Sequence, residues 1–310
     1  FLISFLGGSR VQIGGPTGAF VIIVFNIILK HGYDGMLIAT IMAGFFLIIF
    51  GLLRFGTFIR LIPYPITTGF TSGIAVVIFT TQVKDFLGLN IDKLPAGFYS
   101  MWKIFITNIN SINPWATGIA AISLLIILFW PRITTKLPGS LVAIIAASLA
   151  VYFFQIPVET IGIKFGSISS SLPVPSLPVI SLEKIEHLIT PALTIALLAG
   201  IESLLSAVVA DGMISGSHRP NAELIAQGFA NIASGFFGGL PATGAIARTA
   251  ANVNNGGRTP IAGMTHAIVL LVMLVALMPL AKFIPMCALA AVLVFVAYNM
   301  SEWHSFKALL

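Results

Sequence analysis

The sequence predicts an all-α polytopic membrane protein, and three observations support this fold class. Of the 310 residues, 57% are hydrophobic and only 8% are charged, whereas a soluble domain carries about 25% charged residues. The mean hydropathy of the chain is +1.03. The apolar runs are continuous and about 20 residues long, as in membrane-spanning helices, and not the alternating segments of about ten residues found in barrels.

Ten apolar segments are expected to be membrane helices, in addition to a stub at residues 1–6. Their length and their lack of polar–apolar alternation indicate helices. The intervals 89–113 and 156–190 are rich in Pro, Ser and Asn and are expected to be loops outside the membrane. In chain order, the ten segments are residues 14–29, 36–53, 66–83, 115–129, 137–154, 191–210, 222–237, 243–253, 261–280 and 285–298.

Loop charges predict the orientation of the chain. Alternating the loops places one group of basic residues on the same side: Arg10, Arg54, Arg60, Arg132, Lys136, Arg219, Arg258 and Lys307. The acids Asp211, Glu223 and Glu302 accompany them. Because cytoplasmic loops carry an excess of Lys and Arg, this side is expected to face the cytoplasm. The net charge of +6 is spread over many loops, so no nucleic-acid partner is expected.

Two interrupted segments give the first indication of function. One begins with Gly14-Gly15-Pro16-Thr17-Gly18-Ala19, and the other with Gly238-Gly239-Leu240-Pro241-Ala242-Thr243-Gly244-Ala245. Corresponding interrupted segments in two halves of a chain point to a transporter binding site. Each helix N-terminus offers unpaired N–H groups and partial positive charge to an anion. We expect the two N-termini to face each other near the middle of the membrane. The alternative is that Gly and Pro only kink packed helices.

Two charged residues, Glu202 and Arg248, lie inside apolar segments. A charge at the centre of a membrane helix costs about 2.5–3.5 kcal/mol on insertion scales, so it normally faces a polar interior. Arg248 would add a full positive charge to an anion site. Glu202 and Ser206, four residues apart on one helical face, would hold Na⁺, or Glu202 would carry a proton. The alternative is a salt bridge between Arg248 and Glu202 that only ties two helices together.

Other motifs are uninformative or point to packing. No G-x-S-x-G, H-E-x-x-H or Walker sequence is present, so we expect neither an enzyme nor a cofactor. Thr17 and Thr249 are further polar groups near the expected site, although isolated hydroxyls in helices more often bond a backbone carbonyl. The single cysteine, Cys287, is expected to pack in the interior.

These motifs resemble those of the SulP family of anion transporters, the bacterial relatives of prestin and pendrin. Residues 7–20 resemble the start of the family's third helix, and residues 200–205 resemble its eighth. Residues 247–249, with the turn at 254–259, resemble the tenth helix and the turn that follows it. The resemblance runs along the whole chain.

The resemblance implies a UraA/SulP-like fold of fourteen helices in two inverted seven-helix repeats, divided into a core and a gate domain. On this pattern, residues 1–165 hold the first-repeat membrane helices, from the end of helix two to helix seven. Residues 166–310 hold the second-repeat helices eight to twelve. The fold is then incomplete in this chain, because the first helix, the last two helices and a C-terminal STAS domain are absent. Homodimerisation is expected through that STAS domain.

The resemblance also implies roles for individual residues. The anion would lie between two groups of residues: Thr17 and Gly18 in the first segment, and Thr243, Gly244, Ala245, Ile246, Ala247 and Arg248 in the second. Glu202 would be the coupling residue, with Ser206 beside it, and no metal site is implied. Sodium-coupled bicarbonate members carry an Asp at the Glu202 position and a hydroxyl at the Ile246 position. Because Ile246 cannot ligate Na⁺, a proton is favoured over sodium.

The sequence therefore predicts a secondary active transporter of inorganic anions in the plasma (inner) membrane. Sulfate is the first expected substrate, taken up by proton symport through elevator-type alternating access. The alternatives are a bicarbonate or C4-dicarboxylate transporter, an uncoupled anion channel or exchanger, a prestin-like area motor and, more distantly, a nucleobase permease of the same fold. The expected partners are the small anion, H⁺ and the lipid bilayer.

Overall fold

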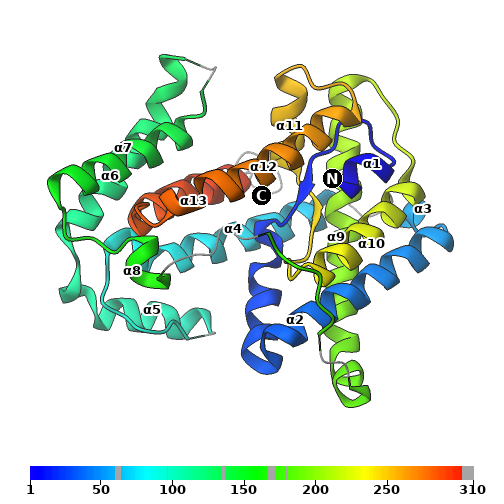
Figure 1. Ribbon diagram of the computed structural model, residues 1–310, viewed down its shortest axis with the longest axis horizontal. Helices are drawn as coiled ribbons and strands as arrows, with labels where there is room; N and C mark the ends of the chain where they lie inside the picture. Colours follow the sequence, from blue (N-terminus) through cyan, green and yellow to red (C-terminus); the bar gives the residue numbers. More distant parts are fainter. Residues whose placement is uncertain (60–63, 96, 135–136, 167–171, 179–180, 302–310) are drawn as a thin grey trace. The chain divides into compact units, whose positions relative to one another are not determined.

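The computed structural model describes residues 1–59, 64–95, 97–134, 137–166, 172–178 and 181–301. Within them the chain is mostly helical (Figure 1). The charged positions Arg60, Lys136, Glu302 and Lys307 lie outside the described residues. By length and composition, four helical stretches of the described chain are long and apolar enough to cross a membrane: Ile23–Leu52, Pro114–Arg132, Leu182–Ile214 and Pro260–Ala281.

The chain forms two compact units. The first unit consists of Phe1–Ile62 and Ser171–Met273, and the second of Pro63–Ser170 and Leu274–Leu310. Each unit therefore takes residues from both sides of the expected repeat boundary at 165/166. A division into two compact parts agrees with the expected core and gate domains, whereas the repeat boundary itself stays a prediction.

The first unit contains the two interrupted segments and packs helices α2, α9 and α10 against one another. Small residues allow α2 and α10 to approach closely, since a side chain on Gly44 would meet the backbone of Gly228. The elements of this unit are α1 (Leu2–Leu6), β1 (Gly14–Gly15), η1 (Gly18–Phe20), α2 (Val21–Leu52), α3 (Gly56–Ile59), α9 (Leu182–Ile214), α10 (Pro220–Phe236), β2 (Thr243–Gly244), α11 (Ile246–Asn254) and most of α12 (Pro260–Ala281).

Helix α2 combines the first two expected segments. It is interrupted at Gly32, whose φ of 71° and ψ of −176° lie outside the helical region. Glycine adopts this positive φ without steric cost, which explains the residue type at the break. The helix begins at Val21, later than expected, because Gly14 and Gly15 form a short strand.

Helix α9 is longer than the apolar pattern indicates. It begins at Leu182, where the Ser181 side chain accepts a hydrogen bond from the Lys184 backbone N–H at 3.2 Å. Such N-caps fix the start of a helix. Pro191 therefore lies inside α9, not at its beginning. The expectation that 156–190 is loop throughout is wrong, because it contains this first part of α9 and helix α8 (Ile161–Phe165).

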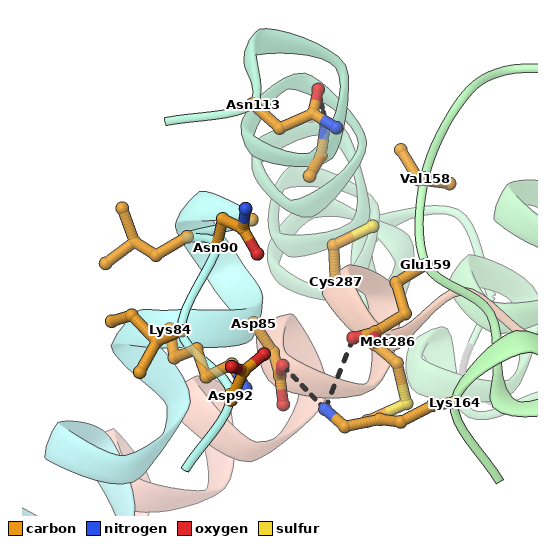
Figure 2. A pocket seen from close by; sticks show the side chains of 14 residues that line it. Lys84, Asp85, Asn90, Asp92, Asn113, Val158, Glu159, Lys164, Met286 and Cys287 are labelled. Carbon is orange, nitrogen blue, oxygen red and sulfur yellow. Dashed lines mark hydrogen bonds and ion pairs between the residues drawn. The ribbon is translucent and has the colours of Figure 1, made fainter. Parts of the chain in front are cut away.

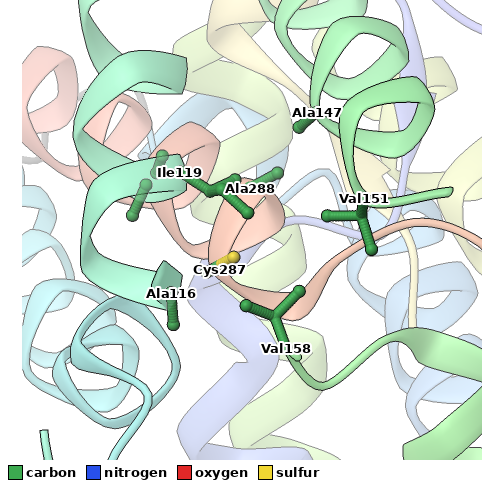
Figure 3. Packing of buried hydrophobic residues seen from close by; sticks show 9 residues of the cluster. Ala116, Ile119, Ala147, Val151, Val158, Cys287 and Ala288 are labelled. Atoms are coloured by element: carbon green, nitrogen blue, oxygen red, sulfur yellow. The ribbon is translucent and has the colours of Figure 1, made fainter. Parts of the chain in front are cut away.

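The second unit is built around a core of small and aliphatic side chains. Figure 3 shows Ala116 and Ile119 facing Cys287 and Ala288, with Val158 closing one side. The packing role expected for Cys287 is confirmed, since this side chain is buried in the cluster. The elements of this unit are α4 (Tyr64–Leu87), α5 (Phe98–Thr107), η2 (Ile109–Ser111), α6 (Pro114–Phe129), η3 (Trp130–Arg132), α7 (Gly139–Phe154), α8, the end of α12 and α13 (Met286–Met300).

Helix α5 corrects a second expectation. The interval 89–113 is not loop throughout, because α5 occupies Phe98–Thr107. Phe105 is buried there, and its ring meets Trp102 edge to face at 5.8 Å between centroids. Polar residues around the helix hide this short apolar face from a search for long apolar runs.

Candidate functional site

The two interrupted segments meet in the first unit and form a two-stranded antiparallel sheet. Gly14 of β1 pairs with Gly244 of β2, and Gly15 pairs with Thr243. The Ala245 N–H extends the pairing by donating to the Ile13 carbonyl at 2.9 Å. Each strand leads into a helix, so the N-termini of η1 and α11 both begin beside this sheet. The expectation that the two segments come together is confirmed.

Two glycines make this close pairing feasible. Gly15 has a φ of 149°, and a Cβ at this position would lie 2.6 Å from the Arg248 guanidinium. A Cβ at Gly244 would overlap the Gln12 side-chain amide. Larger residues would therefore separate the strands from the side chains that pack on them.

Thr17 and Glu202 are in direct contact. The Thr17 hydroxyl donates to Glu202 Oε2 at 2.9 Å, and both side chains are half-buried. Thr17 also precedes η1 and so begins the helical path into α2. The residue expected beside the anion thus touches the residue expected to couple transport.

Arg248 lies on the other side of the same site. It is half-buried, and its Nη2 donates to the carbonyl of Pro16, next to Thr17. Arg248 and Glu202 influence each other electrostatically. The ion pairs among the described residues involve other side chains. The alternative of a salt bridge between Arg248 and Glu202 therefore does not describe this structure.

The first turn of α11 presents backbone donors beside Arg248. Ala245 is the N-cap, so the N–H groups of Ile246, Ala247 and Arg248 have no acceptor within the helix. Ala247 is exposed and Ile246 half-buried, which leaves this turn open. Partial positive charge from the helix and full charge from the guanidinium therefore point to an anion-binding site.

Several predicted residues support the site from behind. Thr243 is fully buried, and its hydroxyl donates to the Ala199 carbonyl at 2.8 Å. Ser206 is also fully buried and donates to Thr249 Oγ1 at 3.1 Å. Thr249 Oγ1 in turn accepts from the Ile13 N–H at 3.0 Å. The structure thus joins Ser206 to the back of the sheet, where its hydroxyl is already used.

Sequence reasoning missed a buried polar group behind the same sheet. Glu223, which the loop charges group with the cytoplasmic side at the start of the expected segment 222–237, lies in the first turn of α10 and is fully buried. It bonds to Ser203 and Gln227, and Gln12 joins them from the segment before β1. One signal could have revealed it: Glu223, Gln227 and Asn231 recur every four residues along an apolar segment, which forms a polar stripe on one face of a helix.

Comparison with known proteins decides the family. The family model described as the sulfate permease family matches residues 1–310. The chain belongs to the sulfate permease family. Its relatives are transporters and not enzymes, and the family's transporters are multi-pass membrane proteins.

Two curated relatives and one solved structure illustrate the range of the sulfate permease family. The Bacillus subtilis protein named "Putative sulfate transporter YvdB" is 45% identical over 97% of this chain. The bicarbonate transporter BicA of Synechocystis is 31% identical over 99% of it. The chain spans 57% and 55% of these two relatives, a little over half of their length. The solved transmembrane domain of a cyanobacterial BicA matches 99% of this chain and 80% of its own, with 30% identity and a TM-score of 0.90.

The second unit of this sulfate permease family member has a polar pocket of its own, with a volume of about 320 Å³. Figure 2 shows Lys164 reaching towards two carboxylates, Asp85 at 2.9 Å and Glu159 at 3.3 Å. Lys164 belongs to α8 and Asp85 to α4. These paired charges hold α8 against α4, and none of the residues predicted for the anion site lines this pocket.

Proposed function

We propose that this chain forms the membrane part of a secondary active transporter of inorganic anions, with sulfate as the first substrate. The observation that carries the proposal is the pairing of β1 with β2, which sets the N-terminus of α11 and the Arg248 guanidinium beside Thr17. A tetrahedral dianion suits a site that combines helix N–H donors with one full positive charge. The name of the YvdB relative points to the same substrate.

Bicarbonate is the second candidate. The solved BicA domain has a TM-score of 0.90 against this chain, so the two share the scaffold on which the site is built. C4-dicarboxylates follow, because they would require a longer site with a second group for the distal carboxylate. A nucleobase permease fits less well, since Arg248 favours an anion over a neutral heterocycle. Transport would proceed by an elevator-type movement of a core domain against a gate domain in the plasma (inner) membrane.

Protons are the coupling ions in this proposal. Glu202 lies beside the anion site through its bond to Thr17, so its negative charge opposes an incoming anion. Protonation removes that repulsion, and a proton and an anion would then bind cooperatively. Sodium is less well supported. The first residue of α11 is Ile246, and its side chain has no oxygen atom that could bind Na⁺.

Uptake by reconstituted full-length protein tests the proposal. Proteoliposomes are given labelled sulfate, bicarbonate, succinate and uracil, with and without pH and Na⁺ gradients. The expected result is saturable sulfate uptake that an inward proton gradient accelerates and a Na⁺ gradient does not. Flux of uracil without flux of any anion would overturn the assignment.

The variant Glu202→Gln tests the coupling role. Since glutamine mimics the protonated acid, we expect anion binding and exchange to persist, while acceleration by an inward pH gradient disappears. The measurement is sulfate uptake at equal and at unequal pH on the two sides of the membrane. Glu183→Gln is the matched control, because Glu183 is exposed in the first turn of the same helix. Retained pH-driven accumulation in Glu202→Gln vesicles would contradict the coupling role.

A further inference from the structure

Helix α9 holds the first interrupted segment at two consecutive residues. Glu202 accepts a hydrogen bond from the hydroxyl of Thr17 on the open side of the site. Its neighbour Ser203 is fully buried. Gln12 Nε2 donates to the Ser203 carbonyl at 2.8 Å and to its Oγ at 3.1 Å. The segment that contains β1 is therefore anchored at both ends on adjacent positions of one helix.

The Ser203 hydroxyl is the centre of a buried network. It donates to Glu223 Oε1 at 3.0 Å and accepts from Gln227 Nε2 at 2.8 Å as well as from Gln12. One donor and two acceptor sites are all that a serine hydroxyl has, so this one is fully used. It links α9 to α10 and to the segment that leads into β1.

Glu223 closes the network from the far side. Its Oε2 accepts from the backbone N–H groups of Gly8 at 2.8 Å and Ser9 at 3.1 Å, and Gln227 Nε2 donates to its Oε1 at 2.9 Å. Three N–H donors and one hydroxyl therefore surround a carboxylate that is fully buried. None of the ion pairs recorded for the described residues includes it.

Gln12 connects this network to the sheet. Its amide lies so close to Gly244 that no Cβ could fit between them. The next residue, Ile13, bonds to the second segment through both backbone groups, its N–H to Thr249 and its carbonyl to Ala245. A displacement of Gln12 would therefore shift β1, β2 and the first turn of α11 together.

We propose that Ser203, Gln12 and Glu223 are positioning residues that set the geometry of the anion site from behind the sheet. An apolar cluster of the same volume would pack as well or better, because burying a carboxylate carries a large desolvation cost. Hydrogen bonds are directional, so this network fixes the position of β1 relative to α9, which an apolar cluster would not do. Their effect on anion binding rests on the proposed function, whereas the anchoring of the sheet does not.

Hydrogen exchange on the full-length protein tests the anchoring directly. In Ser203→Ala, we expect backbone amides of residues 12–15 and 244–249 to exchange about tenfold faster, because the buried partners of the hydroxyl lose a bond. Amides in α7 should be unaffected. Ser148→Ala is the matched control, since its hydroxyl donates to the Ile144 carbonyl within α7 at 2.7 Å. Unchanged exchange at both segments in Ser203→Ala would overturn the proposal.

A second variant guards against a folding defect. Gln12→Met keeps the volume of the side chain and removes its amide, so it should give the same local increase in exchange. If Ser203→Ala fails to fold, Gln12→Met decides the outcome on the same two segments. Normal exchange there would overturn the proposal.

Anion binding gives the functional readout. In both variants we expect the dissociation constant for sulfate to rise about tenfold and the sulfate-to-bicarbonate affinity ratio to change, since the two anions differ in shape. General destabilisation would lower both affinities by the same factor, so an unchanged ratio would contradict a positioning role. If the wild-type protein binds no anion, the proposed function fails, while the exchange experiment still decides whether the network anchors the sheet.

Discussion

Arg248→Gln is expected to weaken anion binding roughly ten- to a hundredfold, while folding and expression persist. The reason is the loss of one charge-assisted contact, which costs on the order of 1.5–3 kcal/mol. In the structure the guanidinium is already held by the Pro16 carbonyl, so an anion at the proposed site would meet a charge that is in place beforehand. The measurement is the dissociation constant of labelled sulfate for the purified variant.

Two further substitutions separate charge from placement. Arg258→Gln is the matched control, because Arg258 is exposed at the other end of α11 and donates to the Val253 and Gly257 carbonyls. It should leave anion affinity unchanged. Arg248→Lys keeps the charge and loses the planar donor fork, so we expect an intermediate affinity. Unchanged affinity in Arg248→Gln would reject a role for this residue in the site.

Gly244→Ala is expected to reduce sulfate binding and transport about a hundredfold. A methyl group at this position would overlap the Gln12 amide, which the network on α9 prevents from moving aside. The strand β2 must then shift, and the N-terminus of α11 shifts with it. Misplacement by about 1 Å costs on the order of a hundredfold where several groups must converge. Uptake and equilibrium binding by the same preparation measure the loss.

A double variant identifies the cause of that loss. Gly244→Ala combined with Gln12→Ala removes the overlap, so the double variant should bind no worse than Gln12→Ala alone. Gly118→Ala is the control for adding a methyl group to a glycine, because a Cβ there meets no atom within 4 Å. If the double variant is as defective as Gly244→Ala, contact with Gln12 is not the reason for glycine at this position.

Membrane helices were predictable where burial in lipid controls the sequence. The expected segment 115–129 corresponds to α6 at Pro114–Phe129, and the expected segment 137–154 corresponds to α7 at Gly139–Phe154. The strand at Gly14–Gly15 was not predictable, because its partner comes from the far end of the chain and no local pattern encodes it. The start of α9 at Leu182 depends on the Ser181 cap and not on apolar character, so a search for apolar runs begins it too late.

The predicted site residues divide in the same way. Glu202 and Arg248 could be selected from the sequence as candidates, because a charge within an apolar run is costly and needs a reason. Their contacts were not predictable, since Arg248 bonds a backbone carbonyl and Ser206 bonds Thr249 instead of facing Glu202. Glu223 was missed because polar residues at every fourth position give a weaker signal than the apolar residues around them.

The pairing of Gly14 with Gly244 also has a consequence for biosynthesis. At about 5–20 residues per second, the ribosome reaches the second strand on the order of ten to fifty seconds after it has made the first. During this interval the polar backbone of the first strand has no partner, which hydrocarbon does not tolerate. We therefore expect the nascent segment around Gly14 to remain in contact with water or the insertion machinery until residue 244 emerges. A ribosome stalled before that point would carry the helices that precede residue 244, but not the paired strands beside which we propose that the anion binds.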